Sequence, residues 1–266
     1  MQASKQTLLW QINNDEFSSA SYVFGTMHAR DQRVFQRLGK VYEAIANCDA
    51  FAAEFNLNDT DIGQSLQAFL MPENMSIEDL LPFKKYQKLR RVILKICNIE
   101  LNFLKYNQPI FVSNFIEERI LSNDMPLALD QHLWQYAAEQ DKIMLGIETL
   151  AEQIAILGSI PIKYQVQALL STTRNISRHR HNLLGMARWY EKGDIQQLYR
   201  TSRRGAHGLR KLLLYDRNNQ MAQRIESIIK NQTTFCAIGA AHLAGTKGVL
   251  RFLKQKGLKV KPVQMK

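Results

Sequence analysis

Two histidines, one near each end of the chain, follow the same short pattern. His28 ends an apolar run in which Gly25 stands three residues earlier, and His242 ends another in which Gly239 has the same place. Each run is typical of a buried strand that a glycine interrupts and a histidine follows. In open α/β sheets, ligands bind beyond the carboxyl ends of the strands. Because packing does not require this pattern twice, we expect the two imidazoles to share one functional site.

Two glutamates end further strand-like runs and add carboxylates to the expected site. Glu54 follows the apolar residues from Phe51, and Glu148 follows Ile143–Ile147. A strand end fixes the backbone that carries the side chain, as a catalytic site requires. Taken singly, such a histidine is also typical of hydrogen-bonded structure, and such a glutamate of a helix cap or an ion pair. The repeated motif favours a site of two imidazoles and two carboxylates.

Arg217 is the cation that the sequence offers to this site. It lies in Asp216-Arg217-Asn218, just before a helix that leads towards the second motif. Its guanidinium could clamp a substrate carboxylate or neutralise Glu148, and an ordinary ion pair is the alternative. The remaining histidines are expected to be structural or on the surface: His132, His179, His181 and His207.

The elements that position these residues also repeat. Each motif is followed by a helical stretch and a second strand-like run: Val34–Asn47 and Ala50–Phe55 after the first, Val249–Lys256 and Leu258–Val263 after the second. Strand, helix and strand in this order form a βαβ unit. We therefore predict an α/β fold, with a mixed central sheet built from two βαβ-type Gly-x-x-His modules.

Other segments extend the sheet and separate the modules. Leu8–Ile12 and a turn at Asn13–Asp15 predict a hairpin edge, and Lys142–Glu148 predicts one more strand. Two large helical insertions, about 58–140 and 149–230, are expected to cover the sheet or roof the site, with a capped helix start at Ser76. Because a shared site makes the first and last strands neighbours, we expect residues 1–266 to form a single domain.

Composition limits the class of protein. Of the 266 residues, 45% are hydrophobic, which suits a globular protein with a substantial core. No segment approaches the roughly 18 consecutive apolar residues of a membrane span. No signal peptide is recognisable, so we expect a cytoplasmic protein as the chain stands, or an exported one whose signal segment lies outside this sequence. Without zinc-finger spacing, the three cysteines are predicted to be buried thiols: Cys48, Cys97 and Cys236.

The net charge of +11 is concentrated in one stretch. Arg174–Lys211 contains ten basic residues and sets only Glu191 and Asp194 against them. Such a stretch attracts nucleic acid, acidic lipid headgroups, an anionic substrate or another acidic partner, and a solvated helical face is the alternative. No motif for reading a nucleic-acid sequence is present, so we expect no sequence-specific nucleic-acid binding.

Taken together, these blocks resemble the TraB/GumN family, which is related to the Tiki metalloproteases. The resemblance covers nearly the whole chain and rests on blocks in a fixed order: Leu8–Ile12, Tyr22–His28, Ala53-Glu54, Asp130, Gly146–Thr149 with Gln153, Arg217-Asn218, Ile238–Gly245 and Gly248. It implies a mixed α/β fold of the type shared with erythromycin esterases and the haem-binding ChaN proteins. It also implies an active site formed by the two Gly-x-x-His motifs and the first glutamate.

Since Tiki proteins are described as manganese- or cobalt-dependent peptidases, the resemblance assigns a divalent metal to His28, Glu54 and His242. We therefore expect a metal-dependent hydrolase that acts on a peptide or another acyl bond. Manganese, cobalt and zinc all suit imidazole and carboxylate ligands. Glu148 would complete the coordination or act as general base, and Arg217 would stabilise developing negative charge.

Two other functions fit the same residues. In a metal-free esterase, one histidine activates water and a glutamate orients it. In a non-catalytic carrier, the site binds haem or a metal without hydrolysis. In each case, alanine at either motif histidine is expected to cost about 1 kcal/mol or less, because truncating a strand-end imidazole beside glycine leaves no large cavity.

Overall fold

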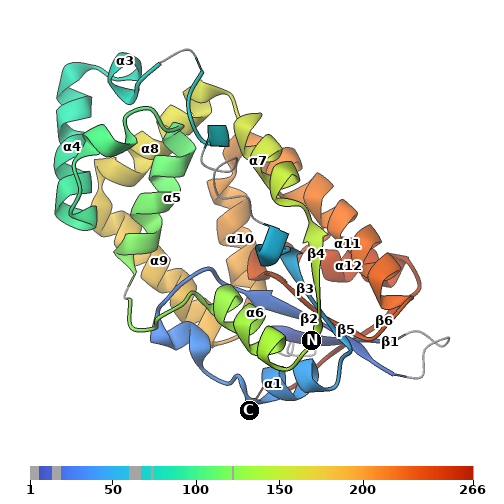
Figure 1. The fold of residues 1–266 in the computed structure, drawn as a ribbon. Helices are drawn as coiled ribbons and strands as arrows, with labels where there is room; N and C mark the ends of the chain where they lie inside the picture. The colour runs from blue at the N-terminus through green and yellow to red at the C-terminus, as the bar shows by residue number, and fades with distance from the viewer. Residues whose placement is uncertain (1–5, 14–18, 60–66, 73–74, 122, 266) are drawn as a thin grey trace. The chain divides into compact units, whose positions relative to one another are not determined.

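A computed structural model describes residues 6–13, 19–59, 67–72, 75–121 and 123–265 (Figure 1). The chain divides into two compact units. The sheet unit comprises Met1–Asp59, Asp124–Thr149 and Met186–Lys266, and the helical unit comprises Thr60–Asn123 and Leu150–Gly185. Most of the turn predicted at Asn13–Asp15 lies outside the described residues.

The sheet unit is built on six strands in the order β4-β3-β5-β2-β1-β6. Strands β4, β3, β5 and β2 run parallel to one another, whereas β1 is antiparallel to both of its neighbours. A mixed sheet combined with eleven α-helices among the described residues confirms the predicted α/β class. The strand bounds are β1 Leu9–Asn13, β2 Ser21–Thr26, β3 Ala50–Phe55, β4 Ile143–Glu148, β5 Thr234–Gly239 and β6 Lys259–Pro262.

A helix and a strand follow each motif, as predicted. After β2, the chain forms the 3-10 helix η1 (Gln32–Phe35) and helix α1 (Gly39–Ala46) before β3. One continuous helix from Val34 was expected, but Arg37 has a φ of 64°, which an α-helix does not allow. After β5, the 3-10 helix η6 (Ala240–His242) and α12 (Val249–Gln255) lead to β6.

The two crossovers run in opposite directions along the sheet. From β2, the chain passes over β5 to reach β3. From β5, it passes in the opposite direction over β2 and β1 to reach β6. Two crossover connections with the same handedness that run in opposite directions place their helices on opposite faces of the sheet. Figure 1 shows α1 on one face together with α6 (Leu129–Glu139), and α12 on the other together with α11 (Asp216–Ile229). Both faces of the central strands are therefore covered.

Aromatic rings on three adjacent strands form the centre of this core. Phe51 and Phe235 stack with ring centroids 5.6 Å apart, and Phe24 lies 6.1 Å from Phe235. All three side chains are fully buried. Truncating such a ring to alanine typically costs about 3–5 kcal/mol. This packing holds β3, β5 and β2 side by side and so fixes the positions of their carboxyl ends.

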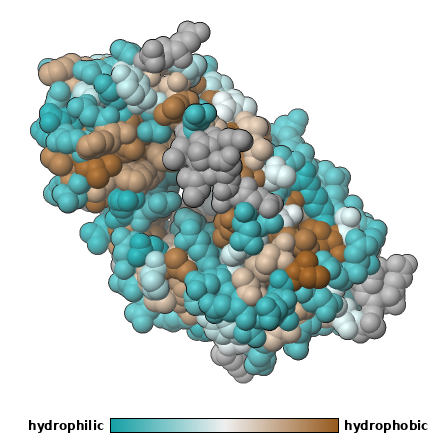
Figure 2. Space-filling view, in the orientation of Figure 1, coloured by the Kyte–Doolittle hydropathy of each residue, from teal (hydrophilic) through white to brown (hydrophobic). Residues whose placement is uncertain are grey.

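The helical unit has a core of its own. It contains α3 (Ile77–Leu80), α4 (Phe83–Cys97), η3 (Leu101–Leu104), α5 (Pro109–Ile120), α7 (Leu150–Gly158), α8 (Ile162–Arg174) and the first part of α9 (Ile176–Glu191). Leu89, Ile116 and Leu169 are fully buried within it. Ser76 caps α3 by accepting from the Asp79 amide, which confirms the predicted capped start. The helical unit also carries exposed apolar side chains, including Phe83 and Phe103. Figure 2 shows hydrophobic residues, in brown, among hydrophilic ones on the surface of this unit.

The prediction for the cysteines is confirmed. The three cysteines are reduced and buried, and burial raises the pKa of the Cys48 thiol to about 12. Among the described residues, no helix combines the length and the apolar character that crossing a membrane requires.

Candidate functional site

Four adjacent parallel strands bring the predicted residues to one edge of the sheet. Glu148 is the last residue of β4, and Glu54 is next to last in β3. Gly239 ends β5, with His242 three residues beyond it, and pairs in register with Thr26 at the end of β2. His28 follows Thr26 by two residues. Since carboxyl ends of parallel strands meet at one edge, segments more than 200 residues apart become neighbours there.

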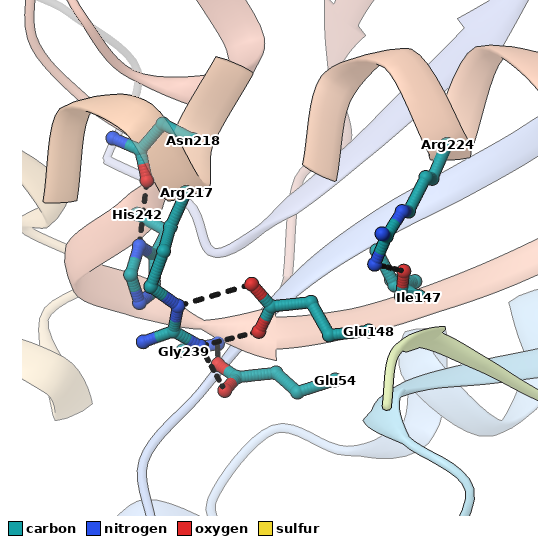
Figure 3. Close-up of polar contacts among 8 residues, drawn as sticks. All are labelled: Glu54, Ile147, Glu148, Arg217, Asn218, Arg224, Gly239 and His242. Carbon is teal, nitrogen blue, oxygen red and sulfur yellow. Dashed lines mark hydrogen bonds and ion pairs between the residues drawn. The ribbon is translucent and has the colours of Figure 1, made fainter. Parts of the chain in front are cut away.

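Arg217 joins the two glutamates (Figure 3). Its Nε donates to Glu148 Oε1 at 3.0 Å and its Nη2 to Glu148 Oε2 at 2.5 Å, while Nη2 also lies 3.3 Å from Glu54 Oε2. Burial by itself lowers the pKa of Arg217, but the hydrogen bonds and charges of Glu148 and Glu54 outweigh it and raise this pKa. The guanidinium therefore stays protonated. The sequence left open whether Arg217 neutralises Glu148, and the structure shows that it does.

The hydrogen bonds of Asn218 define the tautomer of His242. The amide nitrogen Nδ2 of Asn218 donates to the Lys247 carbonyl at 2.6 Å, so its Oδ1 is the atom 2.6 Å from His242 Nδ1. Nδ1 must then carry the proton, which leaves Nε2 with the lone pair. Burial lowers the pKa of His242, and Arg217 lowers it further, against the opposing charges of Glu54 and Glu148. His242 is thus a neutral imidazole with Nε2 as its acceptor.

Gly239 brings Glu54 and His242 together. Its amide donates to Glu54 Oε1 at 2.7 Å. A Cβ at Gly239 would lie 3.0 Å from Glu54 Oε1, 3.4 Å from His242 Cδ2 and 4.0 Å from His242 Nε2. The backbone φ of Gly239 is −54°, which any residue adopts. Glycine is needed here because the carboxylate and the imidazole approach the backbone closely.

Gly25 serves the first motif in a similar way. A Cβ there would lie 2.7 Å from Leu243 Cδ1 and 3.0 Å from the Cα of Ala240. The Gly25 carbonyl accepts from the buried hydroxyl of Tyr190 at 2.7 Å. The glycine therefore allows β2 to pack against the turn that carries His242, and neither motif glycine has a positive φ.

His28 is held by a carboxylate rather than an amide. Its Nδ1 lies 2.8 and 3.0 Å from the two carboxylate oxygens of Asp130, in the first turn of α6. A carboxylate only accepts, so Nδ1 carries a proton and Nε2 is the acceptor in the neutral ring. The His28 side chain is 49% exposed, whereas His242 is buried.

The donor types suit a divalent metal, but the described residues do not form a ready metal centre. Metal-binding histidines usually donate their other ring N–H to a carboxylate or carbonyl oxygen, as His28 and His242 do. Glu54, Glu148 and Asp130 supply three carboxylates, and Arg217 bonds to the first two of them. Within the part of the chain that the structure describes, however, no three His, Cys, Asp or Glu side chains are grouped so as to hold a metal ion.

Comparison with known proteins identifies the family. Residues 8–262 match the model of the TraB/PrgY/gumN family. The chain belongs to the TraB/PrgY/gumN family. Over 97% of its length it is 22% identical to metalloprotease TIKI2 of Danio rerio, to a metalloprotease TIKI homolog of Amphimedon queenslandica and to metalloprotease TIKI1 of Homo sapiens. It spans 61–62% of the length of these relatives. No solved structure matches the chain.

These comparisons confirm the resemblance that the sequence blocks indicated. The three relatives are named as metalloproteases or as a homolog of one. Two partners in this TraB/PrgY/gumN member were not assigned from the sequence: Asp130 for His28 and Asn218 for His242. Both residues lie in blocks that carry the family resemblance, which was the available signal. Tyr190 lies in no such block, so nothing in the sequence pointed to its bond with Gly25.

The other predicted histidines have different surroundings. His132 bonds to the Tyr42 hydroxyl at 2.8 Å, and His179 pairs with Glu117 at 3.1 Å, while His181 is exposed. The basic stretch Arg174–Lys211 runs from the end of α8 through α9 and α10 (Ile195–Gly205) to a π-helix, η5 (Lys211–Tyr215). It is divided between the two compact units at Gly185.

Proposed function

We propose that this TraB/PrgY/gumN family member is a divalent-metal-dependent hydrolase of peptide bonds, or of another acyl bond. The observation that carries the proposal is the gathering of Glu148, Glu54, His242 and His28 at the ends of four adjacent parallel strands. The family relatives named metalloproteases support both the metal and the peptide substrate.

We assign the metal to His28, Glu54 and His242, which would have to lie closer together than in the described structure to coordinate one ion. Both imidazoles direct their Nδ1 protons to oxygen atoms, so Nε2 of each would be the nitrogen available to the metal. Glu54 is the more accessible glutamate, with a side chain 26% exposed compared with 1% for Glu148. Manganese, cobalt or zinc at these donors would supply Lewis-acid chemistry, by polarising the scissile carbonyl and acidifying water.

Arg217 and Glu148 act around this centre. Glu148 is almost fully buried and holds Arg217 through two hydrogen bonds, so we assign it a positioning role. Arg217 also contacts Glu54, so it orients this carboxylate and brings a fixed positive charge to the edge where the substrate carbonyl gains negative charge. Removing Glu148 would then lower activity by releasing Arg217.

Metal binding is the first test. Titration calorimetry with manganese, cobalt and zinc at neutral pH should detect one site in the parent chain, and saturation at a hundredfold excess over Kd should stabilise the fold by about 2.7 kcal/mol. His28→Ala, Glu54→Gln and His242→Ala should each abolish this response. His181→Ala, at an exposed histidine of the helical unit, is the matched control and should bind like the parent. A folded parent chain that takes up no metal would overturn the assignment.

A metal-free hydrolase is the second candidate, and the state of His242 favours it. A buried neutral imidazole whose Nδ1–H is oriented by Asn218 has the arrangement of a general base. Hydrolysis of a peptide and ester library by chelator-treated protein would support this candidate. Loss of hydrolysis on chelation and recovery with added metal would support the first proposal. No hydrolysis together with a Soret band on haem titration would point to a carrier.

We also propose that the exposed cations of α10 attract an acidic substrate or partner. Arg203 and Arg204 are exposed in the last turn of α10, and Arg210 follows as a third exposed guanidinium. Replacing all three by glutamine should weaken binding of an acidic peptide at low salt and reduce its salt dependence. An unchanged salt response would leave this stretch as a solvated surface.

A further inference from the structure

A small pocket adjoins both Gly-x-x-His motifs within the sheet unit. Its volume is about 190 Å³. One wall is formed by the two motifs, through Met27 on one side and Gly239 to His242 on the other. The opposite wall is formed by Met186 of α9 and by Leu198 of α10. Every lining residue belongs to the sheet unit.

The pocket adjoins the proposed site through Gly239 and His242, which both line it. Gly239 lines it, and the Cβ position of this glycine is 3.0 Å from Glu54 Oε1 and 4.0 Å from His242 Nε2. A group bound in the pocket would therefore lie beside His242, which lines it, while Glu54 accepts from the amide of the lining residue Gly239.

The chemistry of the walls favours an apolar group. The lining is almost entirely apolar and includes Met27, Met186, Leu198 and two alanines, and the described residues that line the pocket include no lysine, arginine, aspartate or glutamate. The Tyr190 hydroxyl at its edge is already bonded to the Gly25 carbonyl. An acidic side chain would lose its hydration here without gaining a partner of opposite charge from the described lining residues.

The volume matches one side chain. Sites for drug-sized ligands occupy about 300–1,000 Å³, whereas an apolar cavity of about 150 Å³ holds a single benzene ring. A pocket of about 190 Å³ therefore suits one leucine, methionine or phenylalanine side chain. The flexible thioethers of Met27 and Met186 can adapt to each of these shapes.

We propose that this pocket is a specificity subsite, which binds an apolar side chain of a peptide substrate next to the bond that is cleaved. The proposal rests on the hydrolase function above and narrows its substrate class. In a peptide library, substrates with leucine, methionine or phenylalanine at one position beside the scissile bond should be cleaved at least about 10-fold more efficiently than those with glycine or aspartate there.

Two variants test the walls. Met186→Ala enlarges the pocket and should shift the preference from leucine towards phenylalanine and tryptophan. Ser202→Leu, at a half-buried lining residue of α10, narrows the pocket and should shift the preference towards alanine and valine. Met144→Ala, at a half-buried methionine of β4 outside the pocket, is the matched control and should keep the parent profile. Identical profiles in all four proteins would overturn the proposal.

A binding measurement separates this subsite from the hydrolase function itself. The methionine methyl groups are labelled with carbon-13, and the NMR signals of Met27 and Met186 are assigned by replacing each residue with leucine. N-acetyl-leucinamide should shift both signals, whereas N-acetyl-glycinamide should shift neither. Shifts without hydrolysis of any peptide would retain the subsite and remove the hydrolase. Hydrolysis with no response from either methyl group would retain the hydrolase and remove the subsite.

Discussion

The two Gly-x-x-His motifs end neighbouring parallel strands, but their histidines have different surroundings. His28 is 49% exposed and bonds to the carboxylate of Asp130, whereas His242 is buried and bonds to the amide of Asn218. Asp130 is itself 37% exposed, and Asn218 is fully buried. The histidine of the first motif therefore lies at the surface, whereas the histidine of the second belongs to the core.

This difference in burial separates the contribution of each histidine to stability from its contribution to chemistry. A buried polar group must keep its hydrogen-bond partner, because leaving it unpaired typically costs about 1–3 kcal/mol. An exposed ion pair contributes only about 0–1 kcal/mol, since water replaces the lost partner. His242 should therefore serve stability and chemistry together, while His28 should serve chemistry with little effect on stability.

The largest expected difference involves Arg217. Arg217→Ala should destabilise the fold by about 3–5 kcal/mol, because it leaves Glu148 buried without its ion-pair partner. Asp130→Ala, beside the first motif, should cost less than about 1 kcal/mol. Urea denaturation of both variants would measure the two costs. Equal costs would show that the two ends of the site are equally buried in solution.

The histidines themselves give the next contrast. His242→Ala should cost about 2–3 kcal/mol, because it removes a buried ring and leaves the Asn218 carbonyl oxygen unpaired. This exceeds the cost that its position at a strand end suggested. His28→Ala should cost about 1 kcal/mol or less, as the sequence predicts. Thermal melts of the metal-free variants provide the measurement, and a larger loss for His28→Ala would reverse the comparison.

Replacing each motif glycine with alanine should affect a different property of the protein. Gly25→Ala places a methyl group against Leu243 and the backbone of Ala240, so it should cost about 1–3 kcal/mol of stability. At Gly239, the new methyl group meets the end of the Glu54 side chain, which can move away. Gly239→Ala should therefore lower metal affinity and activity more than stability. Calorimetry would measure the metal affinity of both variants, and denaturation would measure their stability. A larger loss of stability in Gly239→Ala than in Gly25→Ala would contradict these contacts.

The smallest expected effect is a dependence on pH. The pKa of His242 is lower in the folded protein than its ordinary value of 6.5. Below about pH 6.5 the unfolded chain then binds a proton that the folded chain does not, so stability should fall as the pH decreases. In chelated protein, His242→Gln should flatten this decline between pH 7.5 and 5.5, and His28→Gln should leave it in place. Equal slopes in the parent and His242→Gln would contradict the assignment.

Local pattern determined much of what the structure contains. The sequence predicted a strand at Ala50–Phe55 with Glu54 near its end, and β3 has the same bounds. It also predicted the capped start of α3 and the strand that ends at Glu148, because burial and capping leave marks on consecutive residues. The start of the first helix was predicted too early in the chain. Arg37 adopts a positive φ, which an arginine in the sequence does not indicate.

Partners distant in the sequence were decided by tertiary structure alone. Asp130 is 102 residues from His28, and Asn218 is 24 residues from His242, so no local periodicity relates them. The burial of each site residue also depends on which helix covers its strand end, and two identical motifs carry no information about that. The sequence by itself determined which chemical groups reach the edge of the sheet. Only the tertiary structure decided which imidazole is buried and neutral and which meets solvent, because burial and hydrogen-bond partners arise from packing between distant segments.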